Sequence, residues 1–185
     1  MEEKNQLNVL PMLSFGQAIK NVFSKYASFK GRARRSEYWW FQLFEFIIFF
    51  VAAMLDNVLN LDISDTGEGV FSIIIGLFFI LPGLSLLWRR LHDTGRSGWN
   101  YLWVIVPVIF CCILAFTQLF IPMIIAVIVV IVMAVVLLVW CCMDSKPEEN
   151  QYGPSPKYES AAPDDIQNAT GDDTPETSTG TEIIQ

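Results

Sequence analysis

The feature that most constrains this chain is an uncharged run of 43 residues, Tyr101–Met143. As one straight helix the run would be roughly 64 Å long at ~1.5 Å per residue, whereas the hydrocarbon core of a bilayer is about 30 Å thick. The run must therefore fold back once. Pro122 follows the polar pair Thr117–Gln118, and proline is tolerated in the first turn of a helix. We predict a turn at this pair, between spans near 101–119 and 122–142.

Two further apolar blocks precede this run and predict spans near 38–55 and 70–88. Only 17% of the residues are charged, whereas soluble domains carry about a quarter. The chain is therefore expected to be an all-α polytopic membrane protein with four transmembrane helices. Pro82 and Pro107 lie inside spans, where neighbouring groups are expected to satisfy the carbonyls that they leave free.

The charged flanks predict the orientation of these spans. Residues 56–69 contain four acids and no lysine or arginine, and three arginines lie between the second and third spans. The first span is preceded by a cluster of cations: Lys20, Lys25, Lys30, Arg32, Arg34 and Arg35. Because short cytoplasmic flanks carry the excess of lysine and arginine, we expect a multi-pass protein with both termini in the cytoplasm.

An amphipathic helix is predicted over residues 14–30, at the start of a membrane domain spanning 14–143 and after a separate N-terminal segment, 1–13. Its apolar residues recur with the 3.6-residue period of one helix face: Phe15, Ile19, Val22, Phe23 and Tyr26. Two placements stay open. The helix lies in the membrane interface with its lysines toward anionic headgroups, or it packs on the protein itself.

The C-terminal segment, residues 144–185, has ten acids and two lysines, which leaves residues 1–143 with a net charge of +1. It has few apolar residues, so it cannot bury enough surface to offset the entropy of ordering. We predict a disordered acidic cytoplasmic tail, with one local turn at Tyr152–Pro154.

The densest polar cluster, Arg89–Trp99, follows the second span directly. The candidate residues for binding an anion, a lipid or a protein partner are Arg89, Arg90, His92 and Arg96 of this cluster, together with Arg32 and Arg35 of the earlier flank. An architectural interpretation assigns ion-pair and turn roles to Glu37, Asp93, Gly95, Ser97, Gly98 and Trp99. In it Asp93 pairs with one arginine, the glycines turn the chain, Ser97 caps the next helix, and Trp99 lies in the aromatic belt.

A second cluster, Gly31–Phe41, begins the first span at the same predicted membrane face. If the helices form a bundle, the two clusters become neighbours. Glu37 is then the expected partner of Arg89, Arg90 or Arg96, in a partly desolvated ion-pair network that holds the helices together.

Three motifs also carry a resemblance. The segments GRARRSEYW at 31–39, RRLHDTGRSGW at 89–99 and NQYGPSP at 150–156 are similar, in order and spacing, to the signatures of the bacterial inner-membrane family catalogued as domain of unknown function 805. The likeness covers roughly residues 14–156. It implies a multi-span helical protein of the bacterial inner (cytoplasmic) membrane, and it implies no particular activity.

Glu45 lies inside the first predicted span, ~10 Å below its start at ~1.5 Å per residue. Intramembrane acids usually face protein or water and mark function. Proton or ion handling and a hydrogen bond within the bundle both remain open, although spans two to four contain no second charged residue.

Metal, cofactor and enzyme chemistry are not expected. The cysteines form two adjacent pairs, Cys111–Cys112 and Cys141–Cys142, and neighbouring helical residues diverge too far to chelate one metal tetrahedrally. We expect no disulfide between the pairs. His92 is the only histidine, and the chain has neither a phosphate-binding loop nor a dinucleotide fingerprint.

The leading hypothesis is a non-enzymatic membrane protein that binds anionic lipid or a protein partner through a cytoplasmic basic face. The alternatives are a small transporter or channel that uses Glu45, and an enzyme acting on headgroups at the His92–Asp93 turn. Membrane lipids are the expected partners. A protein partner or a homo-oligomer stays open, and no nucleic acid, cofactor or metal is expected.

Overall fold

The structure, a computed structural model, describes residues 7–61, 63, 69–117 and 120–160. Within these residues, four helices are long and apolar enough to cross a membrane. They are α2 (Arg35–Leu59), α3 (Val70–Asp93), α4 (Leu102–Thr117, continuing from the 3-10 turn η1, Gly98–Tyr101) and α5 (Phe120–Cys142). The predicted class, a helical membrane protein with four spans, is confirmed.

The helix boundaries differ from the predicted spans in one informative way. α3 continues past residue 88 to Asp93, and α2 begins at Arg35 and not at residue 38. Both extensions contain charged side chains that are buried against other parts of the protein, so the helices continue beyond their apolar blocks. Pro122 lies in the first turn of α5, as predicted, while Gln118 of the predicted turn lies outside the described residues.

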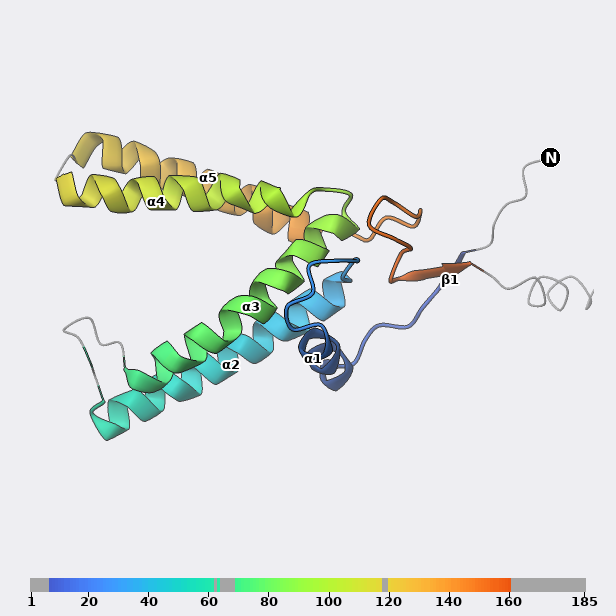
Figure 1. Ribbon diagram of the computed structural model, residues 1–185, viewed down its shortest axis with the longest axis horizontal. Helices are drawn as coiled ribbons and strands as arrows, with labels where there is room; N and C mark the ends of the chain where they lie inside the picture. Colours follow the sequence, from blue (N-terminus) through green and yellow to red (C-terminus); the bar gives the residue numbers. More distant parts are fainter. Residues whose placement is uncertain (1–6, 62, 64–68, 118–119, 161–185) are drawn as a thin grey trace, which may run out of the picture.

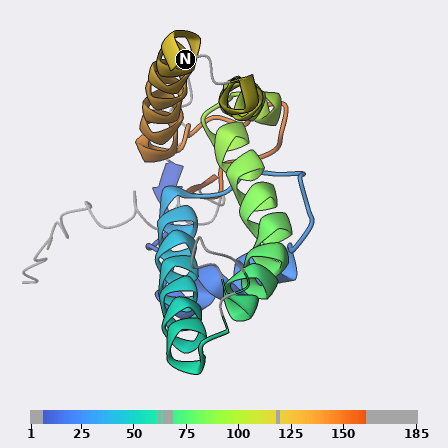
Figure 2. The same ribbon diagram turned by 90° about the vertical axis from the view of Figure 1, so that its left-hand side faces the viewer.

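The helices form two hairpins, α2 with α3 and α4 with α5 (Figure 1). The hairpins meet at the end where α2 begins and α3 and α5 end, which we call the junction end, and they diverge away from it. The view along the hairpins separates the two pairs (Figure 2). Because the chain makes four crossings, the segments before α2 and after α5 both lie at the junction end.

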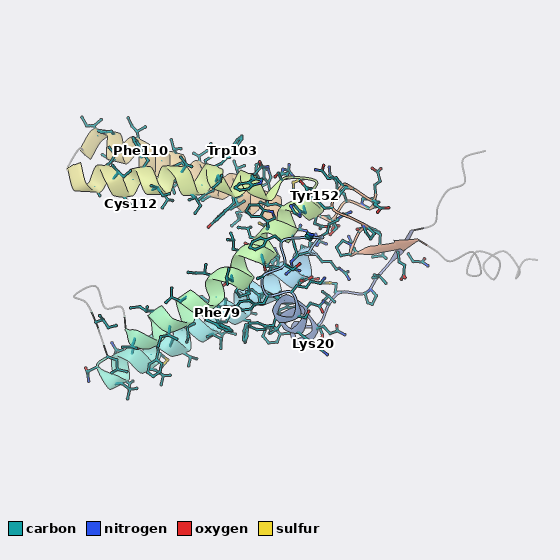
Figure 3. All side chains as sticks on the ribbon, viewed as in Figure 1. Lys20, Phe79, Trp103, Phe110, Cys112 and Tyr152 are labelled. Carbon is teal, nitrogen blue, oxygen red and sulfur yellow. The ribbon has the colours of Figure 1, made fainter. Side chains whose placement is uncertain are left out.

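The predicted amphipathic helix is α1 (Phe15–Ser24), which begins with a reciprocal cap between Ser14 and Gln17. It packs on the first hairpin, because Phe23 makes ring contacts with Phe41 on α2 and Phe79 on α3. Of the two predicted placements, packing on the protein is therefore observed. Figure 3 labels Lys20 on α1 and Phe79 on α3.

The prediction that this helix extends to residue 30 is wrong. Lys25 leaves the helical conformation, and the chain is then held to α3. The hydroxyl of Ser85 lies 3.0 Å from the carbonyl oxygen of Tyr26 and 3.4 Å from that of Lys25. These bonds to α3 replace the helical continuation.

Pro82 lies inside α3 and leaves the carbonyl of Phe78 without its helical donor. The hydroxyl of Tyr26 donates to that carbonyl oxygen over 2.6 Å. A neighbouring side chain thus satisfies the group that the proline leaves free, as the sequence predicted.

At the opposite end of the first hairpin, Asp56 of α2 caps the start of α3. Its carboxylate accepts from the backbone amides of Phe71 at 2.9 Å and Ser72 at 2.8 Å, and from the Ser72 hydroxyl at 2.7 Å. A Cβ on Gly69 would lie 2.0 Å from the Asp56 carboxyl carbon. Glycine is therefore required where the carboxylate closes onto the helix.

The prediction of a disordered tail starting at residue 144 is wrong for residues 144–160. They form an ordered segment, here called the strap (144–157), followed by strand β2 (Tyr158–Ser160). β2 pairs antiparallel with β1 (Leu7–Val9), with Val9 opposite Tyr158. This small sheet was not predicted, and residues 161–185 of the predicted tail lie outside the described residues.

Candidate functional site

The junction end is organised around the buried carboxylate of Asp93, the last residue of α3. One oxygen lies 2.9 Å from Nε of Arg32. The other lies 2.5 Å from a terminal nitrogen of Arg90 and 2.5 Å from the Ser145 hydroxyl. Asp93 therefore joins the segment before α2, the end of α3 and the strap.

Arg90 connects α3 to the end of α5. Its side chain is fully buried, and it donates to the carbonyl oxygens of Cys141 at 3.1 Å and Ala33 at 3.1 Å, and to that of Met143. The last carbonyls of a helix have no intrahelical donor. A cation at this position also complements the helix dipole, so Arg90 caps α5 and attaches the second hairpin to the first.

Arg32 holds the strap in the same way. Its terminal nitrogens donate to the carbonyl oxygens of Lys146 at 2.5 Å, Glu148 at 2.8 Å and Gly153 at 3.3 Å. The strap also has an ionic contact of its own, Lys157 with Asp144 at 2.5 Å. The hydrogen bond from Lys157 lowers the pKa of Asp144, and the same bond raises the pKa of Lys157.

The third buried arginine, Arg89, pairs with Glu37 at 3.0 Å, with both side chains at most 5% exposed. This is one of the partnerships that the sequence predicted. Nε and the second terminal nitrogen of Arg89 have no hydrogen-bond partner in the part of the chain that the structure describes. We refer to Arg32, Glu37, Arg89, Arg90 and Asp93 as the arginine cluster.

The remaining predicted basic residues lie outside this cluster. Arg35 is exposed, 3.7 Å from Asp144. Arg96 is half-buried, with its guanidinium 4.6 Å from the centre of the Trp140 ring. Arg32, Arg89 and Arg90 therefore hold the protein together internally, and the exposed cationic surface consists of other residues.

His92 does not form a catalytic pair with the adjacent Asp93, whose carboxylate is directed at arginines. The His92 ring stacks on Tyr152 of the strap, with 3.6 Å between ring centres and 2° between planes. Its Nδ1 lies 3.1 Å from the carbonyl oxygen of Gly31. A carbonyl only accepts, so Nδ1 carries the proton and donates.

The turn between α3 and η1 has the predicted roles. Gly95 adopts a left-handed φ of 78°, and the Ser97 hydroxyl accepts from the amide of Trp99 at 3.3 Å, capping η1. Gly98 is needed for a further reason, because a Cβ there would lie 2.0 Å from the Trp88 indole. Trp99 is 65% exposed, in keeping with a position in the aromatic belt.

Glu45 is placed away from the arginine cluster, whereas Cys141 contacts the cluster through its backbone carbonyl, which accepts from Arg90. Glu45 is half-buried in α2 and accepts from the Gln42 amide at 3.3 Å. All four cysteines have free thiols. Among the described residues, no group of three histidine, cysteine or acidic side chains is placed to hold a metal.

Several residues of the junction end were missed by sequence reasoning. Arg34 is buried and donates to the carbonyl oxygens of Pro11 at 2.8 Å and Leu10 at 3.0 Å. Ser145 binds Asp93, and the amide of Asn150 donates to the His92 carbonyl at 3.0 Å. The available signal was the third motif, which contains Asn150 and Tyr152 and which composition alone assigned to a disordered tail.

The profile of the family described as Protein of unknown function (DUF805) matches residues 26–154. That range contains the whole arginine cluster and the strap as far as its turn.

Two curated relatives come from Escherichia coli (strain K12). Inner membrane protein YhaH is 36% identical over 138 residues, covering 75% of this chain and 94% of the relative. Inner membrane protein YhaI is 33% identical over 139 residues, covering 75% and 93%. No solved structure matches the chain. The chain matches the family profile, and its alignments with the two relatives cover nearly the whole length of each relative. The chain therefore belongs to the DUF805 family.

Proposed function

We propose that this is a non-catalytic protein of the bacterial inner membrane whose junction end faces the cytoplasm and binds anionic phospholipid. The names of the two relatives, both inner membrane proteins, support a location in the inner membrane. The charge asymmetry supports the orientation. Residues 14–36, at the junction end, contain six cations and no acid, whereas residues 56–69, at the opposite end, contain four acids and no cation.

One observation carries the lipid proposal: four of these six cations remain exposed although the arginine cluster is buried. They are Lys20, Lys25, Lys30 and Arg35. Each cation near an anionic membrane surface contributes about 1 kcal/mol. Because α1 packs by its apolar face on α2 and α3, Lys20 on α1 and Lys25 directly after it are held beside the spans, where we expect them to meet the headgroups.

Lipid is favoured over a protein partner by the position of these charges. They lie on the segment that leads directly into α2, and Trp99 and Trp103, both more than half exposed, mark the interface at the start of the third span. The buried arginines make contacts inside the protein, so they are not available to a protein ligand.

The test is lipid retention by the purified full chain in mild detergent. Native mass spectrometry should find that phosphatidylglycerol is retained over phosphatidylethanolamine with the same acyl chains. Replacing Lys20, Lys25 and Lys30 together by glutamine should abolish the preference, whereas Lys146→Gln, an exposed lysine of the strap, should leave most of it. A wild-type protein without any preference would contradict the proposal.

A second candidate, a small transporter or channel, rests on Glu45. This carboxyl lies inside a span and faces α3, since a Cβ on Gly83 would be 3.9 Å from Glu45 Oε2. Protein or water is the usual surrounding of intramembrane acids that move ions. Proteoliposome flux that is abolished by Glu45→Gln would favour this candidate, and flux indifferent to the substitution would count against it.

A further inference from the structure

A cavity of about 480 Å³ lies beside the arginine cluster, where three distant segments of the chain meet. Its volume falls within the range of small-ligand sites. The lining residues are Phe29, Lys30, Gly31, Trp88, His92, Ser97, Trp99, Gln151 and Tyr152. Figure 3 labels Tyr152 at this end of the molecule. The lining contains no carboxylate, and Lys30 is the only lysine or arginine in it.

The walls of the cavity are aromatic and held in place. Trp88 packs edge-on against both Trp99, with 5.3 Å between ring centres, and Phe29, with 5.7 Å. The absence of a side chain at Gly98 lets the Trp88 indole occupy its position. Tyr152, stacked on His92, closes the cavity from the strap side. These rings offer flat apolar surfaces at the ends of two spans, where headgroups lie.

His92 contributes one hydrogen-bond acceptor to the lining. The residue is only 6% exposed, and its Nδ1 donates to the Gly31 carbonyl. Nε2 is therefore left as an acceptor, and it is not one of the fully buried unpartnered atoms of the described residues. An acceptor in the lining of a cavity suits a ligand that brings a hydrogen-bond donor.

These properties define a chemical class of ligand. The exposed ammonium of Lys30 suits a phosphate oxygen, Nε2 of His92 suits a hydroxyl donor, and the faces of Trp99 and Tyr152 suit the C–H surface of a polyol. A headgroup with its own ammonium would add a second positive charge to a cavity that has no carboxylate. A fully ionised phosphate monoester has no hydroxyl donor, so it would leave the histidine acceptor unsatisfied.

We propose that this cavity binds a phosphodiester carrying a hydroxylated, glycerol-like headgroup, as found in one class of anionic phospholipid. The inference rests on the proposed function and names its site and headgroup. It explains why residues of all three motifs, at 31–39, 89–99 and 150–156, meet here. The exposed lysines provide general attraction for anions, and the cavity provides discrimination among them.

The experiment measures a ratio in which general attraction favours the more highly charged phosphatidic acid, so a preference for phosphatidylglycerol reports on the cavity. Full-length protein in mild detergent is offered equal amounts of phosphatidylglycerol and phosphatidic acid with identical chains, and retained lipid is counted by native mass spectrometry. Wild type should prefer phosphatidylglycerol roughly tenfold, the effect of one well-placed hydrogen bond. His92→Phe, which keeps the stacked ring and removes both ring nitrogens, Nε2 among them, should bring the ratio to one or below.

Two further variants keep the test decisive. Trp99→Leu alters a largely exposed wall residue, so this variant should fold even if His92→Phe does not. It should also lower the ratio. Lys20→Gln removes an exposed cation on α1 outside the cavity, and it should reduce retention of both lipids without lowering the ratio. Displacement of the lipid by water-soluble glycerophosphoglycerol would support recognition of the free headgroup, and resistance to it would support the membrane lipid as ligand.

The possible failures are distinguishable. If wild type retains both anionic lipids over phosphatidylethanolamine but in equal amounts, or if His92→Phe and Trp99→Leu leave the ratio unchanged, the cavity proposal is overturned and the proposed function stands. If wild type shows no anionic preference at all, both are overturned.

Discussion

The guanidinium groups of the arginine cluster lie inside the protein, where a cation is stable only with close partners. Moving an ion out of water costs several kcal/mol. Arg32 and Arg90 recover this cost through a shared carboxylate and several backbone carbonyls. Arg89 has only Glu37 among the described residues, so its charge depends on one contact.

We therefore expect Glu37→Leu to destabilise the protein by about 3–5 kcal/mol, because it leaves the Arg89 charge buried without a partner. The double variant with Arg89→Met should recover most of that loss, since two apolar side chains of similar volume replace the pair. Unfolding in detergent, followed for the wild type, both single variants and the double variant, measures this. Equal destabilisation by the single Glu37→Leu and the double variant would contradict the argument.

Two glycines provide a matched pair for a second prediction. A Cβ at Gly98 would lie 2.0 Å from the Trp88 indole, whereas a Cβ at Gly16 in α1 meets nothing within 4 Å. Gly98→Ala should therefore lower the melting temperature sharply and change the tryptophan fluorescence. Gly16→Ala should raise stability by about 0.5–1 kcal/mol, the usual gain of alanine over glycine in a helix. Tolerance of Gly98→Ala would show that the indole has room to move.

At the scale of secondary-structure elements, α3 needs hydrogen-bond partners from other segments at two places, Pro82 and its first turn. The Tyr26 hydroxyl satisfies the Phe78 carbonyl, and the Asp56 carboxylate satisfies the first amides. No water is available at membrane depth to replace such partners. The long-range contacts of α1 and α2 are therefore part of what makes α3 continuous.

This dependence predicts a coupling between Tyr26 and Pro82. Tyr26→Phe should cost about 1–3 kcal/mol, because it leaves a carbonyl unsatisfied. In a Pro82→Ala background the restored amide donates to the same carbonyl, so the same substitution should cost much less. A double-mutant cycle of unfolding free energies measures the coupling, and additive effects would contradict it.

The strap is held in part by the contact of Lys157 with Asp144, which gives it a pH dependence. The pKa of Asp144 is lowered, so its contribution is complete above the unfolded-state value and is lost as the pH falls through the lower folded value. The pKa of Lys157 is raised, so its contribution is complete below about 10.5 and is lost as the pH rises further. The pair therefore stabilises the strap between these limits.

Amide hydrogen exchange of residues 144–160 should accordingly be faster in Lys157→Gln than in wild type at pH 7. The difference, after correction for intrinsic exchange rates, should shrink as the pH falls below about 4 and vanish once the pH lies below the lowered pKa of Asp144, where the carboxyl is protonated in both proteins. Lys146→Gln, which leaves this pair intact, is the control. A difference that persists unchanged at pH 3 would contradict an ionic origin.

At the scale of the whole molecule, the spans and several of their contacts were predictable because they follow from local composition. Long uncharged runs predict the four helices, and neighbouring charged motifs at one membrane face predict that Glu37 pairs with Arg89, Arg90 or Arg96, of which the structure has Arg89. The strap was not predictable in the same way. The strap is held mostly through its own backbone carbonyls, which accept from Arg32. Every residue has a carbonyl, so these contacts leave no signal in the sequence, and the polar composition of the strap indicated disorder.

The end of α1 at Ser24 and the burial of Arg34 also depend on contacts between distant segments. The apolar period continues through Tyr26 and predicts a longer helix, but Tyr26 is needed at the Phe78 carbonyl. For Arg32, Arg89 and Arg90 the sequence likewise leaves a binding role and an architectural role open, because nothing local distinguishes a guanidinium that binds lipid from one that binds carbonyls inside the protein.

Every functional proposal depends on the junction end facing the cytoplasm. Cysteine labelling tests this directly in a variant whose four natural cysteines are replaced, with single cysteines placed at Ile63, between α2 and α3, or at Gln151 in the strap. Both positions are exposed. In intact bacteria whose outer membrane has been permeabilised, a membrane-impermeant maleimide should label Ile63→Cys, whereas Gln151→Cys should react only after the inner membrane is also opened. The reverse pattern would contradict the account.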